Sequence, residues 1–108
     1  MPTYLYVVTA GLKEVGRTVC YREAAKLLVT RVKALVDGGY SRSVIGACWI
    51  TGYRLPEGED VQQALGPAID PRRYHWAGLD SYQHVINQSH NSGWIRDGEW
   101  VDSPPVPA

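Results

Sequence analysis

The sequence predicts an α+β fold: a small antiparallel sheet of four to five strands, one long amphipathic helix packed on one face, a short second helix and a C-terminal β-hairpin. Three observations predict it. Two segments, residues 3–9 and 43–53, have strand-like apolar patterns, residues 21–36 repeat apolar side chains with a helical period, and an Asp-Gly pair near the C-terminus is flanked by alternating residues. We expect one domain over residues 1–102 and a flexible, proline-rich tail over residues 103–108.

The first strand is expected at Thr3–Thr9, where β-branched and aromatic residues make both faces apolar, so a central place in the sheet is favoured. Ala10–Gly16 contains two glycines and charged residues and is interpreted as a connection. Arg17–Tyr21 is interpreted as a second strand, antiparallel to the first. Ser43–Tyr53 is interpreted as a long strand. One of its faces has two glycines, and we expect the helix to pack on this thinner face, Val44, Gly46, Cys48, Ile50 and Gly52.

The long helix is the clearest element of the sequence. Apolar residues recur three and four positions apart, which places them on one face of a helix. They are Tyr21, Ala24, Ala25, Leu28, Val29, Val32, Leu35 and Val36. Gly38 and Gly39 follow directly, and glycine readily takes the left-handed conformation that ends a helix.

The region after the predicted strand Ser43–Tyr53 is rich in proline and glycine. Leu55–Arg72 is therefore interpreted as mostly loop, with a short helix at Glu59–Leu65 inside it. Arg73–Ala77 has the composition of a further short strand.

The C-terminal part is expected to form a helix and a hairpin. Asp80 is a good N-cap for a helix that continues to about His90 and is closed by Gly93. In Trp94–Val101 the central pair Asp97-Gly98 favours a type I′ turn, because both residues tolerate a positive φ.

The aromatic composition favours protein binding as the function. The chain has seven Tyr, four Trp and no Phe, and Tyr and Trp are enriched at interfaces. The alternative is that a protein without Phe builds its core from these residues. Trp94 and Trp100 should lie close together across the hairpin, with one in the core and the other exposed. The candidate protein-binding residues are Tyr74, Trp76, Trp94 and Trp100.

The leading hypothesis is therefore a non-enzymatic protein-binding module whose partner is another protein or a second copy of the chain. In general character, a small domain with few site residues and many Trp and Tyr is similar to accessory proteins of phages or mobile elements, including inhibitors of host defence proteins. This similarity depends on composition and size and not on a shared motif.

A nucleic-acid-binding function is the alternative. Residues 1–54 hold eight Lys and Arg against three acidic residues, and residues 55–108 hold three against eight, so the net charge is zero. Cations on one helix face can neutralise phosphates, but on an exposed helix they are more often a solvated surface, and the two halves can also neutralise each other. The candidate residues are Arg22, Lys26, Arg31, Lys33 and Arg42.

A small enzyme that uses Cys or His with a carboxylate is the third hypothesis. Cys20 and Cys48 are expected to be buried in core strands, where a thiol is inert, although a disulfide between them stays open. Asp80 and His84 share a helix face, and His75 could approach them to complete a minimal metal triad. A cap and two surface histidines are the simpler interpretation, and we expect no cofactor and no metal.

The sequence also bears on location. No segment approaches the roughly 20 apolar residues needed to span a bilayer. The N-terminus has no basic region followed by an apolar core, so no signal peptide is expected. We expect a cytoplasmic protein that does not enter a membrane.

Overall fold

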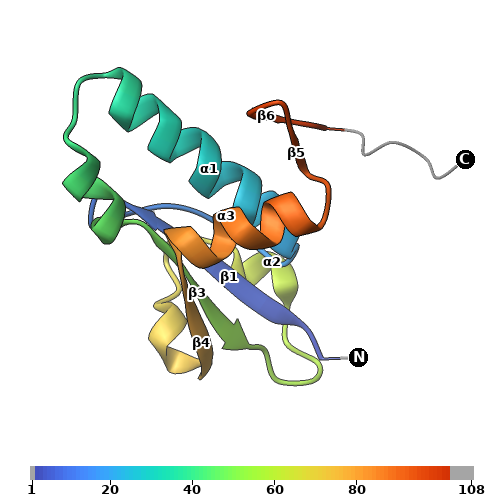
Figure 1. Cartoon of the computed structure of the whole chain (residues 1–108). Helices are drawn as coiled ribbons and strands as arrows, with labels where there is room; N and C mark the ends of the chain where they lie inside the picture. Colours follow the sequence, from blue (N-terminus) through green and yellow to red (C-terminus); the bar gives the residue numbers. More distant parts are fainter. Residues whose placement is uncertain (1, 103–108) are drawn as a thin grey trace, which may run out of the picture.

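The computed structural model of the protein describes residues 2–102 and confirms the predicted α+β class. Its centre is a four-stranded antiparallel sheet in the order β2-β1-β3-β4, with α1 and α3 on one side (Figure 1). The strands of the sheet are β1 Tyr4–Ala10, β2 Lys13–Thr18, β3 Trp49–Arg54 and β4 His75–Ser81. The other elements are α1 Tyr21–Asp37, α2 Val61–Ala64, α3 Tyr82–Asn91, β5 Ile95–Arg96, β6 Glu99–Trp100 and two 3-10 helices, Arg42–Ala47 and Pro71–Arg73. The predicted tail, residues 103–108, lies outside the described residues.

The β1–β2 hairpin differs from the prediction. Ala10–Gly16 is not a long connection, because Gly11 and Leu12 both have φ 67° and form a two-residue turn, so the second strand starts at Lys13. The predicted second strand, Arg17–Tyr21, is therefore wrong by about four residues, because the observed strand is Lys13–Thr18. It ends at Thr18, and Tyr21 already begins α1.

Helix α1 has the predicted bounds to within one residue. Its apolar face, Ala24, Ala25, Leu28 and Val32, packs on Val8 and Ala10 of β1 and on Cys48 and Ile50 at β3. The face of β3 that receives the helix is therefore the thin one, as expected. At the C-terminus Gly39 has φ 93°, and the next N–H, of Tyr40, donates to the Leu35 carbonyl (3.1 Å), which closes the helix.

The long strand expected at Ser43–Tyr53 is only half correct. Arg42–Ala47 is a 3-10 helix, and β3 begins at Trp49. The Ser41 side chain accepts a hydrogen bond from the Ser43 N–H (3.2 Å) and starts the helical turn. Local serine hydrogen bonds of this kind compete with strand pairing, and an alternating apolar pattern does not reveal them.

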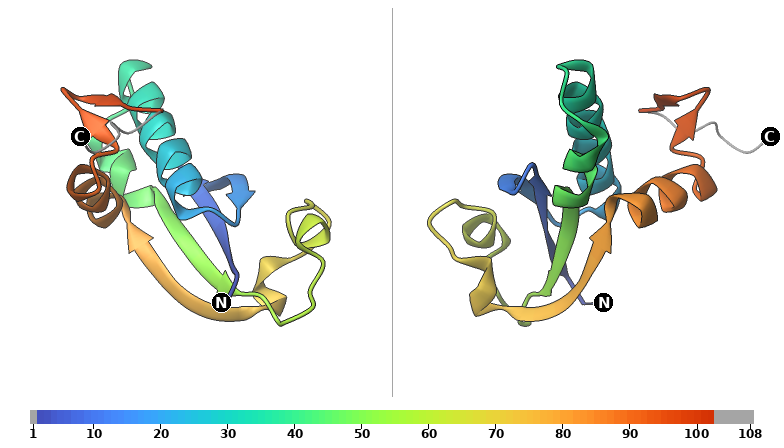
Figure 2. Two further views of the ribbon diagram at one scale, coloured as in Figure 1. Left: turned by 90° about the vertical axis from the view of Figure 1, so that its right-hand side faces the viewer. Right: turned by 60° about the vertical axis from the view of Figure 1, so that its left-hand side comes forward.

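Part of the opposite face of the sheet, over β1, is covered by the segment between β3 and β4, on the side away from α3 (Figure 2). It contains α2, which lies within the predicted Glu59–Leu65 helix and is capped by the Asp60 carboxylate. A second core forms here from Leu5, Val7, Leu55, Ala64 and Tyr74.

The side chain of Arg17 fastens this segment to β2. Its Nη1 donates to the backbone carbonyls of Ala64 (3.3 Å), Gly66 (3.1 Å) and Ile69 (2.7 Å). Its other nitrogens pair with the Glu14 carboxylate at 2.9 and 3.1 Å. Only 8% of the Arg17 side chain is exposed, so the charge lies inside a cage of oxygen atoms.

Strand β4 extends beyond the predicted end at Ala77. Gly78, with φ 144°, adopts a conformation open to glycine and lets the strand continue after an irregularity in the β3–β4 register. Asp80 is consequently a strand residue opposite Ile50, and the prediction that it caps the next helix is wrong. Ser81 caps α3 instead, because its side chain accepts from the His84 N–H (3.3 Å).

The C-terminal hairpin is confirmed. Asp97 (φ 52°) and Gly98 (φ 79°) form the turn, with Ile95 opposite Trp100 and Arg96 opposite Glu99. These two short strands form a sheet of their own, and Figure 1 shows it beside α1, above the end of α3.

Candidate functional site

Strand β4 is an outer strand of the sheet, and its free edge pairs with no other strand among residues 2–102. Trp76 and Leu79 are 60% and 52% exposed. They lie opposite Tyr53 and Thr51 of β3, so both side chains are on the face away from α1. An open strand edge with exposed apolar side chains on one face is the arrangement that accepts an added strand.

Tyr74, the neighbouring candidate, lies inside the protein. It is 6% exposed in the second core, and its hydroxyl donates to the Glu59 carboxylate (3.0 Å). Burial raises the pKa of the Tyr74 phenol, and the bond to Glu59 raises it further. Of the two candidates in this stretch, only Trp76 is therefore presented to solvent.

The hairpin tryptophans belong to a row of aromatic rings that ties the hairpin to the sheet. Ring centroids are 6.4 Å apart for Tyr4 and Tyr6, 5.4 Å for Tyr6 and Tyr21, 6.2 Å for Tyr21 and Trp94, and 5.9 Å for Trp94 and Trp100. The predicted contact between the two tryptophans is confirmed. Both are partly buried against the main core, so the expectation that one is exposed is wrong.

The hairpin also pairs with the first cations of the basic helix face. Arg22 lies over the Trp100 ring, 5.5 Å from its centroid, and donates to the backbone carbonyls of Val101 and Asp102. Lys26 forms an ion pair with the Asp102 carboxylate, and this pair lowers the pKa of that carboxyl. These contacts join positions more than 75 residues apart in the chain.

The rest of the basic face is divided. Lys33 pairs with Glu99 of β6 (3.3 Å), whereas Arg31 and Arg42 are exposed and form no ion pair with any residue in the described part of the chain. The opposed charges of the two halves thus meet within one molecule. The basic helix face offers a polyanion fewer free cations than the sequence suggested.

The cysteines lie in different surroundings. Cys48 is 2% exposed and its thiol donates to the Val44 carbonyl (3.3 Å), in agreement with the prediction of a buried residue. Cys20 was expected to be buried in a strand, but it is exposed at the N-cap of α1, because β2 ends earlier. Both thiols are free.

The predicted cluster of histidines and a carboxylate is brought together only in part. His84 Nε2 and the Asp80 carboxylate are 3.8 Å apart. His75 lies at the other end of β4, opposite Arg54, and does not join them. Within residues 2–102 no three His, Cys, Asp or Glu side chains gather closely enough to hold a metal ion.

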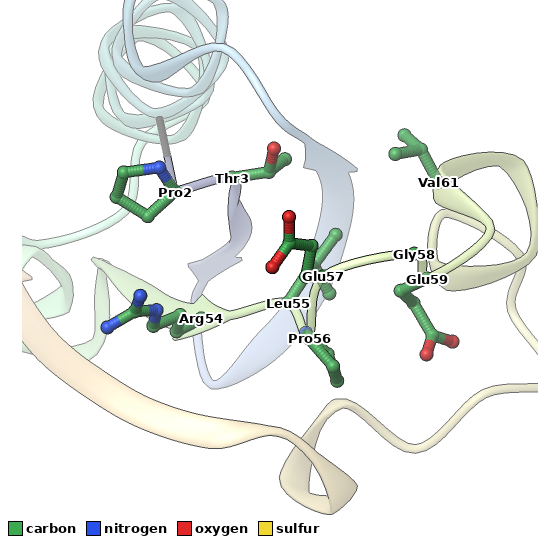
Figure 3. A pocket seen from close by; sticks show the side chains of 9 residues that line it. All are labelled: Pro2, Thr3, Arg54, Leu55, Pro56, Glu57, Gly58, Glu59 and Val61. Carbon is green, nitrogen blue, oxygen red and sulfur yellow. The ribbon is translucent and has the colours of Figure 1, made fainter.

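A hollow of about 580 Å³ lies between the start of β1 and the loop after β3 (Figure 3). In this view the side chains of Arg54 and Glu59 point away from each other, with Glu57 between them. Because these charged groups do not converge on one point, the hollow lacks the convergent polar groups of a ligand site.

A smaller hollow of about 260 Å³ lies on the helix side of the sheet, across β1, β3 and β4. Its lining includes the Tyr4 and Tyr6 rings, Gly52 and Gly78, and the Asp80 carboxylate. Gly52 and Gly78 are paired across the two strands, so at this register position neither strand places a side chain in the hollow.

Sequence reasoning missed Leu79 and this hollow for one reason. The predicted strand ends at Ala77 and the predicted helix begins at the Asp80 cap, so Gly78 and Leu79 fall in neither element. The available signal was the apolar Leu79 two residues beyond Ala77, which continues an extended segment when the intervening glycine forms a bulge.

Comparisons with known proteins identify no relative of this chain. No helix in residues 2–102 combines the length and the apolar character needed to cross a membrane. No family model, curated protein or solved structure matches the chain.

Proposed function

We propose that the protein is a protein-binding module that acts without catalysis and accepts an extended segment of its partner along the free edge of β4. The observation that carries this proposal is the pair of exposed side chains, Trp76 and Leu79, on one face of that unpaired strand. In strand addition, backbone hydrogen bonds supply affinity and alternate side chains supply specificity. Tryptophan, the residue type at position 76, is among those most often found to dominate binding energy at protein interfaces.

The distribution of the other candidates supports the same surface. Tyr74, Trp94 and Trp100 pack into the protein and leave Trp76 as the exposed member of the predicted aromatic set. The ion pairs of Lys26 and Lys33 with the C-terminal hairpin weaken the case for a nucleic-acid interface on α1. The two free thiols support a reducing compartment such as the cytoplasm.

The test is a selection of extended peptides from a displayed library against the immobilised chain, followed by NMR of the complex. Bound peptides should shift the amide signals of His75–Ser81. Trp76→Asp should abolish binding, because a charge replaces the exposed ring. The matched control is Leu12→Asp, which changes an apolar residue in the β1–β2 turn that is even more exposed (76%) than Trp76 (60%) and should have no effect. Selected peptides that bind Trp76→Asp as well as the wild type would contradict the proposal.

A second copy of the chain also fits this strand. His75 and Asp80 lie on one face of β4, and Trp76 and Leu79 lie on the other, so two antiparallel β4 strands could place Trp76 against Leu79 and His75 against Asp80 of the second copy. Sedimentation velocity across a concentration series distinguishes this case: a dimer that Trp76→Asp converts to monomer identifies the chain as its own partner. If the partner is a host protein, as for an accessory protein of the kind described above, the same two variants test the interaction. Trp76→Asp should lose binding to that protein, and Leu12→Asp should keep it.

A further inference from the structure

The hollow across β1, β3 and β4 has the composition of a site for a positively charged organic group. The rings of Tyr6 and Tyr21 meet at 77°, with centroids 5.4 Å apart, and Tyr4 lies beside Tyr6 at the edge of the hollow. Aromatic faces attract cations through the ring quadrupole, most strongly where water is partly excluded. The paired glycines Gly52 and Gly78 leave the space between the strands open.

The Asp80 carboxylate supplies the negative charge. Only 35% of its side chain is exposed, and within residues 2–102 its one ion-pair neighbour is His84, 3.8 Å away, which carries a charge only when protonated. No Lys or Arg of the described chain approaches it within ion-pair distance. The carboxylate thus lies at an aromatic hollow without a permanent counter-charge.

The hydroxyl of Tyr21 is a polar neighbour of the Asp80 carboxylate. It is buried and has no hydrogen-bond partner of good geometry among the described residues, although Asp80 lies beside it. Burial raises the pKa of the Tyr21 phenol, and the neighbouring Asp80 carboxylate raises it further. A carboxylate has about four acceptor positions, so Asp80 can face the Tyr21 hydroxyl and still accept from a further donor in the hollow.

We propose that this hollow binds an organic cation, an alkylammonium or guanidinium group, held between the Tyr4 and Tyr6 rings and the Asp80 carboxylate. A volume of about 260 Å³ admits the head of such a group with a short alkyl chain. The cation belongs either to a free amine or to a Lys or Arg side chain of a partner segment. In the second case the side chain crosses Gly78 and Gly52 from a strand added at β4, and this source rests on the proposed function.

The experiment is an NMR titration of the full chain with n-butylammonium and n-butylguanidinium, with n-butanol as the neutral control of matched shape. We expect saturable shifts of the Gly52 and Gly78 amides with the cations and none with the alcohol. Asp80→Asn should weaken cation binding about ten-fold, because it removes the charge and keeps the shape. Asp97→Asn, which removes a carboxylate in the hairpin turn, should leave it unchanged.

A second variant tests the hollow itself. A Cβ added at Gly52 would lie 3.8 Å from the Tyr6 ring and 3.9 Å from Ala77, so Gly52→Ala fits without a clash and partly fills the space. It should weaken cation binding, whereas Gly46→Ala, which adds a methyl group to open solvent, should not. Equal shifts with butanol and butylammonium, or cation binding that survives both Asp80→Asn and Gly52→Ala, would overturn the proposal.

The two sources are separated by a peptide arm. If the cation is a partner side chain, an extended peptide with a central Lys should bind more tightly than n-butylammonium. It should also shift the amide signals on the unpaired edge of β4. Equal affinities would identify a free amine. Trp76→Asp blocks strand addition and leaves the hollow intact, so this variant should lose peptide binding and keep butylammonium binding. The two readouts therefore distinguish failure of the proposed function from failure of this site.

Discussion

The two outer strands of the sheet, β2 and β4, differ in how far the rest of the chain covers their faces. Leu27 of α1 packs over Gly16 of β2 on one face, and Arg17 holds the loop after α2 on the other. Strand β4 has no comparable cover, and Trp76 and Leu79 stand in solvent. Open edges favour association, and natural proteins usually protect them. Both strands end the sheet, but only β2 has its two faces covered, and β4 keeps Trp76 and Leu79 exposed on one face.

The largest effect on stability should come from Tyr74, which directly precedes β4, in contrast to Trp76 within the strand. Tyr74→Ala empties part of the second core and should lower the free energy of unfolding by about 4 kcal/mol, as large-to-small aromatic changes do. Trp76→Ala should change it by less than about 0.5 kcal/mol, since most of the ring is already solvated. Urea unfolding of both variants measures this difference. Equal losses would mean that Trp76 is structural, and the contrast between the strands would then fail.

Removing the cover of β2 should have the next largest effect. Arg17→Leu leaves three loop carbonyls without their donor and should lower the free energy of unfolding by about 3 kcal/mol. Hydrogen exchange should increase in the loop after α2 and on β2. Arg72→Leu is the matched control, because that side chain is 82% exposed and, within residues 2–102, forms its ion pair with the nearby Asp70. A stable Arg17→Leu variant with unchanged exchange would show that the loop is held by its apolar contacts alone.

The packing of α1 on β2 is tested at Gly16. A Cβ there would lie 2.5 Å from Leu27 Cδ2, so Gly16→Ala forces that side chain to move. We expect a loss of about 1 kcal/mol in thermal or urea unfolding, because the end of a leucine can yield at modest strain. Gly46→Ala, where no atom lies within 4 Å, should leave stability nearly unchanged. An equal response at both positions would mean that β2 is covered less tightly than its geometry indicates.

The smallest effect on stability is expected from the ion pairs of the hairpin. Glu99→Gln with Asp102→Asn removes both carboxylates that pair with α1, at positions that are mostly solvated. Unfolding should barely change, but retention on heparin at low salt should increase, because Lys26 and Lys33 are released. Unchanged retention would indicate that α1 has no latent affinity for polyanions.

The elements that were predicted well depend on local chemistry. The helical period of residues 21–36 and the Asp97-Gly98 turn each carry their signal within a few residues, and both lie where expected. The errors are at positions where two local signals compete. Leu12 adopts a positive φ that its type does not favour, and Ser41 diverts an apolar segment into a 3-10 turn.

The candidate site was predicted only through Trp76. Composition identified Tyr and Trp as the residues to examine, but it could not separate Tyr74 from Trp76, which are two positions apart and differ in exposure by a factor of ten. Tertiary packing decides this difference. Tyr74 ends the 3-10 helix before β4 and packs into the second core, whereas Trp76 lies within β4, opposite Tyr53, where most of its ring is solvated.

The sequence by itself determined the α+β class, the long helix, the hairpin and the opposed charges of the two halves, because period, turn type and charge are properties of neighbouring residues. Tertiary structure alone decided which outer strand is covered and that Lys26 and Lys33 meet carboxylates of their own chain. It also decided that Tyr4, Tyr6 and Asp80 surround one hollow. These relations join residues from distant parts of the chain, and only the packing of α1, the hairpin and the sheet fixes the distances between them.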